Sequence, residues 1–269
     1  MKAPSRARRV TTGLVVCTLC LPSCKPEAPI PRDLSRWNWQ EAQEVASIVD
    51  ALSALHLRAD GTLLGLDDDG FVVSIASLET DAPAEGWPRW PLAGGGDLEG
   101  LCGTDSADVL VLLEDRSELV RLGSNGRRIA THTLDAQIPR GEQGLEGLAW
   151  IPSAQGGASL WLGHQGQAKV YVVRAPSGPE ESKPLELLRV LDLEDEARGL
   201  VFDPDLGAVL AVVDEAREVW MVELNGRIRD RRAWPKGTRD VEGITLGPGG
   251  CLLLALDGGG VWRIPAVEG

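Results

Sequence analysis

Acidic residues that directly precede a glycine recur along the chain at a nearly constant interval. Glu99, Glu146 and Glu242 each stand between an aliphatic residue and a glycine, and Arg198 and Ser53 occupy the same place in two similar steps. We call these five the pivot residues. The pivots at positions 53, 99, 146, 198 and 242 lie 46, 47, 52 and 44 residues apart. A regular interval predicts equivalent places in a repeating fold, so the three glutamates and the arginine are expected to converge.

Converging carboxylates repel one another, and three arrangements would relieve the repulsion. They can ligate a hard cation such as Ca²⁺ through oxygen, pair with Arg198, or take up protons through raised pKa values. Alternatively, they serve only the structure, by satisfying backbone N–H groups and Arg198 in a polar channel. Asp97 and Asp240 lie two residues before a pivot and would share its face in an extended strand. With Ca²⁺ as the expected cofactor, the predicted metal ligands are Asp97, Glu99, Glu146, Asp240 and Glu242.

A second acidic set follows the second apolar run of most repeats. It comprises Asp67-Asp68-Asp69, Glu114-Asp115, Asp214-Glu215 and Asp257. Most of these residues are predicted to form the tight turn into the next strand, because Asp stabilises such turns. The same turns can open at the mouth where the pivots meet. The predicted ligand-binding residues are therefore Glu99, Glu146, Arg198, Glu242, Glu114, Asp214 and Glu215.

The sequence lacks the usual templates for catalysis. His56, His132 and His164 do not have the spacing of a histidine metal centre. There is no G-x-S-x-G elbow, phosphate-binding loop or dinucleotide fingerprint. We therefore predict no catalytic residues, and a non-enzymatic binding or scaffold protein. The alternative is a Ca²⁺-dependent hydrolase of phosphate or lactone esters, in which a channel cation polarises the substrate and a carboxylate activates water.

The segments between the pivots indicate the elements that must position them. Each pivot is followed by apolar, β-rich runs separated by Gly, Asp and Pro turns, which is typical of antiparallel strands. A period of 44 to 52 residues predicts an all-β fold, a β-propeller with about five blades. Six blades remain possible if 172–194 hides an irregular one, and a β-sandwich is the alternative architecture. Residues 37–50 are expected to supply the outer strand of the last blade and close the ring.

The first two dozen residues predict export and a lipid anchor. A basic start is followed by an apolar segment at 13–21, too short to span a bilayer, which takes about 20 residues. This pattern is typical of a signal peptide. Leu21-Pro22-Ser23-Cys24 resembles the lipobox of bacterial lipoproteins, which predicts lipidation of Cys24. The expected domains are a signal peptide at 1–23, a lipidated cysteine with a Pro-rich tether at 24–34, and the propeller at 35–269.

The charge balance bears on partners and location. The 269 residues include 27 Lys and Arg against 40 Asp and Glu, a formal net charge of −13. A net-negative surface repels phosphate backbones, so no nucleic acid is expected. The expected partners are a membrane, through the anchor, and a small ligand or envelope protein. Lys25 after the modified cysteine favours the outer membrane, with the protein facing the periplasm or the exterior. Cys102 and Cys251 are expected as independent buried thiols.

Four stretches, in order, carry a resemblance to a known family. They read DLEGLC with EDR at 97–102 and 114–116, QGLEGLAWIP at 143–152, RGLVFDPDLGAVLAVVDEAREVWMVELNG at 198–226, and DVEGITLGPGGCLLLALDGGGVWRI at 240–264. The second resembles the G-F-E-G-L-A-W segment of the SdiA-regulated (YjiK-like) family of exported bacterial β-propellers. The likeness covers about residues 35–265. It implies an envelope propeller, and so concerns the fold more than the function.

Overall fold

The computed structural model describes residues 32–47, 51–67, 70–75, 78, 88–92, 97–139, 144–178 and 183–267. The predicted signal peptide, Cys24 and most of the tether lie outside these residues, as do Asp68 and Asp69. The described helical turns are short, namely η1 (Leu34–Arg36), η2 (Trp39–Glu41) and η3 (Pro248–Gly250). In this part of the chain, no helix is long and apolar enough to span a membrane.

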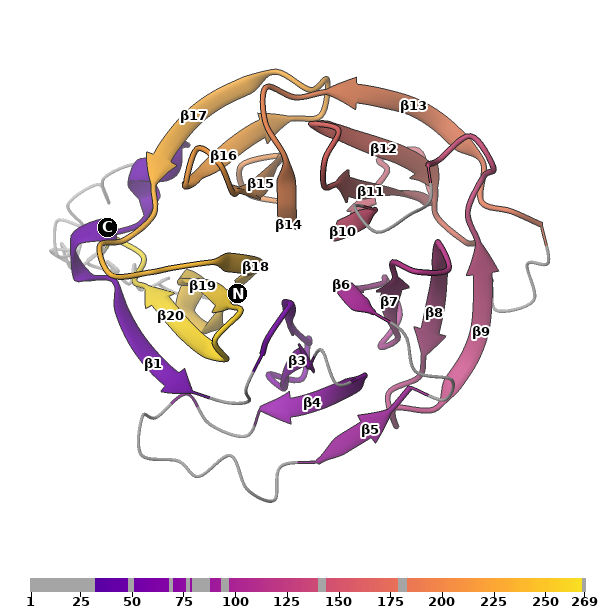
Figure 1. Cartoon of the computed structure of the whole chain (residues 1–269), viewed down its shortest axis with the longest axis horizontal. Coiled ribbons are helices and arrows are strands. Elements are labelled where there is room, and N and C mark those ends of the chain that lie inside the picture. Colours follow the sequence, from indigo (N-terminus) through magenta and orange to yellow (C-terminus); the bar gives the residue numbers. More distant parts are fainter. Residues whose placement is uncertain are drawn as a thin grey trace, which may run out of the picture. The chain divides into compact units, whose positions relative to one another are not determined.

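The unit from residue 30 to 268 is a ring of five four-stranded antiparallel sheets (Figure 1). In the first three blades the strands follow the chain from the centre outward. Blade 1 contains β2 (Ala54–Leu57), β3 (Leu63–Asp67), β4 (Phe71–Ile75) and β5 (Arg89–Pro91). Blade 2 contains β6 (Leu98–Gly103), β7 (Val109–Leu113), β8 (Glu118–Leu122) and β9 (Arg128–Thr133). Blade 3 contains β10 (Leu145–Pro152), β11 (Ala158–His164), β12 (Lys169–Arg174) and β13 (Leu187–Asp192).

The last two blades complete the ring, and the final one takes its outer strand from the start of the domain. Blade 4 contains β14 (Ala197–Asp203), β15 (Ala208–Val213), β16 (Glu218–Glu223) and β17 (Ile228–Ala233). Blade 5 contains β18 (Val241–Leu246), β19 (Leu252–Leu256) and β20 (Gly260–Ile264), with β1 (Gln43–Ser47) outside them. β1 runs antiparallel to β20, from Gln43 opposite Arg263 to Ser47 opposite Gly260. The predicted five-bladed propeller and its closure by 37–50 are therefore confirmed.

The two alternative architectures, a six-bladed propeller and a β-sandwich, are wrong. Residues 172–194 hold the end of β12 and the whole of β13, the outer strand of blade 3, and no sixth blade. A sandwich would stack two sheets face to face, whereas here five sheets surround one axis (Figure 1). Each small sheet has two faces to bury, and circular stacking covers both.

Strand composition follows position in the blade. The second strands are buried on both faces: all residues of β7 and β15 are buried, and both strands are continuous aliphatic runs. The outer strand β17 reads IRDRRA and is mostly exposed. Because β17 faces solvent, its sequence carries no apolar run. The outer strand β13 instead reads LLRVLD, although it too is mostly exposed.

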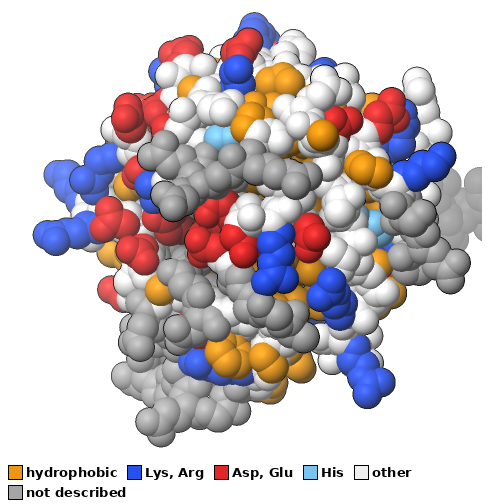
Figure 2. Space-filling model, turned by 45° about the vertical axis from the view of Figure 1, so that its right-hand side comes forward, with side chains coloured by type: hydrophobic (Ala, Val, Ile, Leu, Met, Phe, Trp, Pro, Cys, Tyr) orange, Lys and Arg blue, Asp and Glu red, His pale blue; other side chains and the backbone are white. Residues whose placement is uncertain are grey.

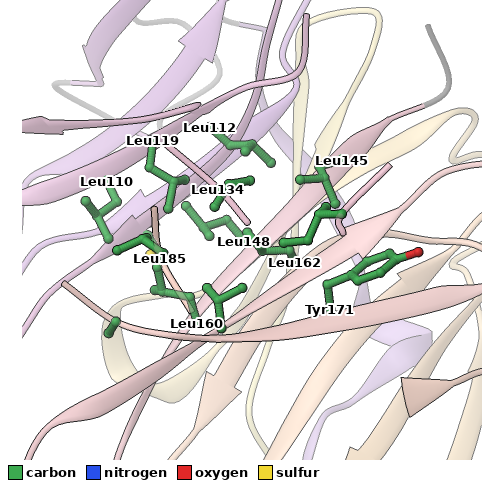
Figure 3. Close-up of a cluster of buried hydrophobic side chains, with 14 residues drawn as sticks. Leu110, Leu112, Leu119, Leu134, Leu145, Leu148, Leu160, Leu162, Tyr171 and Leu185 are labelled. Carbon is green, nitrogen blue, oxygen red and sulfur yellow. The ribbon is translucent and has the colours of Figure 1, made fainter. Parts of the chain in front are cut away.

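The core consists of five hydrophobic clusters, one at each junction between neighbouring blades. Figure 3 shows the cluster between blades 2 and 3, where Leu110 and Leu119 pack with Leu148 and other residues of β10 and β11. Trp161 and Trp220 belong to the cluster between blades 3 and 4 and are almost completely buried. Burial of large apolar side chains at the junctions fixes the blades, and hence the pivots, around the axis.

Candidate functional site

The pivot residues lie at β-bulges in the first strands of four blades. The register with the second strand shifts between Leu98 and Gly100, and again between Val241 and Gly243. In blades 3 and 4, two residues of the first strand lie outside the register with the second strand. One of the two is the pivot, Glu146 in blade 3 and Arg198 in blade 4. A bulge leaves its extra residue out of the ladder and redirects its side chain. The sequence repeat located the pivots, but it gave no signal of the bulges.

The glycine that follows every pivot except Ser53 allows the first strands to approach one another closely. A Cβ on Gly199 would lie 2.7 Å from the carbonyl oxygen of Glu242 in the next blade, and one on Gly147 would overlap the carbonyl of Arg198. The strands therefore leave only a narrow gap at the axis. This gap, bordered by Ser53, Glu99 and Glu146, measures about 10 Å³, roughly the space that one water requires. The channel is thus almost closed at the level of the pivots.

Arg198 contacts carboxylates from three elements. We call Arg198, Glu146, Asp214 and Glu242 the arginine cluster. The guanidinium Nη2 of Arg198 lies 2.8 Å from Asp214 Oδ2, its Nε lies 3.6 Å from Glu146 Oε2, and its Nη1 donates a hydrogen bond to Glu242. The guanidinium side chain is only 18% exposed. A planar fork with five donors suits several acceptors at once. Ion pairing is therefore how this side of the mouth relieves the repulsion.

Burial also shifts the protonation of these carboxyl groups. Desolvation raises the pKa of Glu146 to about 8, against the opposing effect of Arg198, and the negative charges of Glu242 and Glu114 add to the rise. Burial likewise raises the pKa of Glu242, again opposed by Arg198. Glu146 Oε2 is buried and accepts no hydrogen bond in the described part of the chain. Glu146 is thus held largely protonated at neutral pH, the third of the predicted ways to relieve repulsion.

A second group, the carboxylate cluster, consists of Asp97, Glu99 and Glu114. One oxygen from each lies within 4.8 Å of the other two. Glu114 is buried and anchored, because its Oε1 accepts a hydrogen bond of 2.5 Å from the backbone N–H of Gly144. Burial raises the pKa of Glu114, and the neighbouring Asp97 adds to the rise. Glu99 is half-buried and Asp97 exposed, so the cluster is open to solvent.

The predicted metal set is therefore divided by the structure. Asp97 and Glu99 lie together, with Glu114 as the third partner, whereas Glu146 and Glu242 face Arg198. Asp240 does not join Glu242: its backbone has a φ of 46°, which breaks the alternation of an extended strand, and its side chain is exposed. The shared face predicted for Asp240 is wrong for this reason.

The acidic turns play the structural role that was predicted for most of them. The carbonyls of Glu114 and Asp214 accept hydrogen bonds from the backbone N–H groups of Ser117 and Arg217, which close the turns. Asp214 in addition reaches Arg198, but Glu215 is exposed and belongs to neither cluster. The predicted ligand set thus loses Glu215. Acidic side chains also gather in a patch on the face drawn in Figure 2, with Lys and Arg at its edge.

Comparisons with known proteins support the fold. No family model matches the chain, and neither does any curated relative. Among solved structures, a Bacteroides caccae protein of unknown function is similar, with 14% identity, a TM-score of 0.52, and coverage of 76% of this chain and 70% of that one. A luciferin-regenerating enzyme aligns with 12% identity and a TM-score of 0.54, over 84% and 95% of the two chains. The chain is thus a five-bladed β-propeller whose function must be argued from its own residues.

Proposed function

We propose that this propeller is a non-enzymatic binding protein of the bacterial cell envelope whose carboxylate cluster binds a divalent cation, with Ca²⁺ as the first candidate. The single observation that carries the proposal is the spacing of the Asp97, Glu99 and Glu114 oxygens, all within 4.8 Å of one another. Ca²⁺ holds its oxygen ligands at about 2.3–2.6 Å, so two ligands across the ion are separated by about 5 Å. The cluster therefore needs little rearrangement.

The surroundings of the cluster favour a hard cation. Glu114 is fixed by the Gly144 N–H through one oxygen and also interacts with the side chain of Asp97, so a cation would replace the proton that the two carboxyl groups share. Asp97 is exposed, so that an ion can enter from solvent and keep water molecules as additional ligands. Three carboxylates give the charge and the hard oxygen donors that Ca²⁺ prefers.

The lipid anchor and the envelope location complete the proposal. They rest on the basic and apolar start of the chain and on the lipobox-like step at Cys24. The resemblance of four ordered stretches to the SdiA-regulated (YjiK-like) family is consistent with an exported propeller. In this setting the cation site would serve a small ligand or another envelope protein at the mouth.

One observation favours the hydrolase as a second candidate. Glu146 stays largely protonated near neutral pH, and the charge of Glu114 is among the causes, so an acid group lies near the proposed cation. Hydrolysis would need a cation to polarise the ester, a carboxylate of the cluster to take a proton from the attacking water, and a carboxylic acid to protonate the leaving group. Ca²⁺-dependent turnover of p-nitrophenyl phosphate or of a simple lactone, lost in Glu146→Gln, would establish this candidate in place of the non-enzymatic one.

Calorimetric titration of the purified protein with CaCl₂ tests the cation site. We expect one ion per chain, with affinity reduced about tenfold or more, about 1.4 kcal/mol, in Glu99→Gln and in Glu114→Gln. Because the pKa of Glu114 is raised, protons compete with the ion, and affinity should increase as pH rises.

The matched control for this titration is Glu186→Gln. Glu186 is 62% exposed on the outer surface and pairs with Arg174. Its loss should leave Ca²⁺ binding unchanged. No heat with Ca²⁺ and no rise in melting temperature would contradict the proposal, as would an equal loss of affinity in Glu186→Gln.

A further inference from the structure

The first strands continue past the pivots and surround a second space, distinct from the acidic mouth. This cavity has a volume of about 650 Å³. Its lining includes one aliphatic residue from each blade, two positions after each pivot. These five residues are Leu55, Leu101, Leu148, Leu200 and Ile244. They also border the narrow gap between the pivots, which identifies them as the floor of the cavity.

The walls are apolar, with a few polar groups. Trp150, Val201 and Phe202 contribute apolar surface, and His56 and Thr245 contribute groups that can form hydrogen bonds. The ring of His56 lies directly over Gly103, where a Cβ would come 2.6 Å from the imidazole Cε1. Glycine at 103 therefore makes room for the imidazole in the wall. Desolvation, with a contribution from Arg58, lowers the pKa of His56 to about 4, so the ring is neutral at neutral pH.

The charged residues at the rim are already engaged within the protein. Arg58 donates hydrogen bonds to the carbonyls of Ser124 and Ala107, at 3.2 and 3.3 Å, and lies 3.9 Å from Asp60. Asp108 pairs with Arg121 at 2.8 Å. A charged ligand would lose hydration on entering the cavity without gaining a dedicated counter-ion, which is unfavourable. The lining therefore favours a neutral occupant.

We propose that this cavity binds an uncharged, mainly apolar small molecule that carries one hydrogen-bonding group directed at His56. The volume lies within the range of about 300–1,000 Å³ typical of small-molecule sites. The closed floor and the walls of regular strand give the cavity a fixed depth, which suits a compact molecule. A neutral imidazole offers one donor and one acceptor to such a ligand.

Fluorescence titration with 1-N-phenylnaphthylamine, an uncharged apolar probe with one N–H, tests this proposal. We expect saturable binding to the native protein that is about tenfold weaker in Val201→Trp, which fills the cavity. The matched control is Val190→Trp on the outer strand β13, where the valine is 41% exposed and remote from the lining residues. That control should bind the probe as the native protein does.

A second probe tests the charge preference. Anilinonaphthalene sulfonate has a similar apolar body but a fixed negative charge, and we expect it to bind about tenfold more weakly than the neutral probe. Equal or tighter binding of the anion would refute the preference for a neutral ligand. Absence of saturable binding of the neutral probe would overturn the site itself, as would an equal effect of the two tryptophan substitutions.

The same variants also distinguish probe binding in this cavity from Ca²⁺ binding at the carboxylate cluster. Circular dichroism melting shows whether Val201→Trp is folded, and if it is not, Leu57→Trp blocks the same cavity from blade 1. Either folded variant should bind Ca²⁺ as the native protein does, because its substitution lies beyond the gap between the pivots. A parallel loss of both ligands would show global damage, and the cavity assignment would then be withdrawn.

Discussion

The two halves of the acidic mouth relieve the same electrostatic repulsion in different ways. In the arginine cluster, the guanidinium of Arg198 contacts Glu146, Asp214 and Glu242. In the carboxylate cluster, three acidic side chains surround a space that an added cation would fit. Both halves are built from a bulged first strand and the turn that follows a second strand. They differ in the side chain at the pivot and in the bulge, which skips one residue in blade 2 and two in blades 3 and 4.

The comparison shows how much one position can decide in a repeat protein. Residue 198 occupies the place of Glu99, Glu146 and Glu242, and it alone among the pivots is basic. In the arginine cluster the guanidinium of Arg198 already balances the charge of the carboxylates, so a bound metal ion is not needed there. The opposite side keeps an acidic residue at its pivot, Glu99, beside Asp97 and Glu114. The residue type at the pivot thus sets how charges are arranged on each side of the ring.

Replacing the built-in cation should have the largest effect. Arg198→Met leaves three partly buried carboxylates facing one another, and removal of one partner from a buried ion cluster typically costs roughly 3 kcal/mol or more. We expect a loss of unfolding free energy of this size in urea denaturation, partly recovered by added CaCl₂. Recovery would show that the arginine half can be converted into a second carboxylate cluster.

The control for this substitution is Arg227→Met on the outer surface. Arg227 pairs with Glu223 within one exposed turn and its side chain is 69% exposed. Exposed pairs contribute little to stability, because solvent screens them, so the control should be nearly neutral. A loss below about 1 kcal/mol in Arg198→Met would mean that the cluster adds little to stability, and the contrast between the halves would lose its energetic basis.

Most of the fold was predictable because a repeat makes each signal appear several times. The second strands are long aliphatic runs, and the pivot steps keep a near-constant interval, so blade number and ring closure followed. The outer strand of the last blade was predicted from residues 37–50, but the outer strands of the other blades were missed, because a solvent-facing strand such as β17 has no apolar pattern. The apolar cavity was missed as well. Its lining residues, for example Leu55 and Ile244, look like ordinary core in the sequence.

The site was predicted only in outline, and the backbone explains the rest. Convergence of the pivots follows from the repeat, but their partners depend on the bulges, which move Glu146 and Glu242 toward Arg198. The positive φ of Asp240 cannot be read from an Asp before a Val-Glu step. Glu114 was expected among the ligand-binding residues, but its place beside Asp97 and Glu99 depends on the Gly144 hydrogen bond across blades.

The next prediction concerns the backbone that brings the arginine cluster together. In Gly147→Ala the new Cβ would overlap the carbonyl oxygen of Arg198, so β10 and β14 must separate. Overpacking of this kind costs about 2 kcal/mol, and the pair of Arg198 with Glu146 should weaken. Gly178→Ala, where a Cβ meets nothing within 4 Å, is the matched control. Equal melting temperatures for the two variants would show that close strand approach does not hold the cluster.

The smallest expected effect is a change in how the unfolding free energy depends on pH. This measurement distinguishes protonation of Glu146 from ion pairing between Glu146 and Arg198. Because burial raises the pKa of Glu146 from 4.5 to about 8, the native state holds a proton there that the unfolded state loses. Between these pH values the unfolded state binds fewer protons at Glu146 than the native state does. The contribution of Glu146 to the unfolding free energy therefore falls as pH rises. Gln at 146 keeps the shape of the neutral acid and does not titrate. Glu146→Gln should therefore gain progressively on the native protein from pH 5 to pH 8 in urea denaturation.

The surface variant Glu186→Gln should show no such gain, because Glu186 is largely exposed. Parallel stability curves for native protein and Glu146→Gln would mean that Arg198 keeps Glu146 ionised. The arginine half would then rely on ion pairing alone, and the acid group that favours the hydrolase candidate would be absent. A gain that continues up to about pH 8 and then levels off would show that Glu146 keeps its proton at neutral pH in the folded protein.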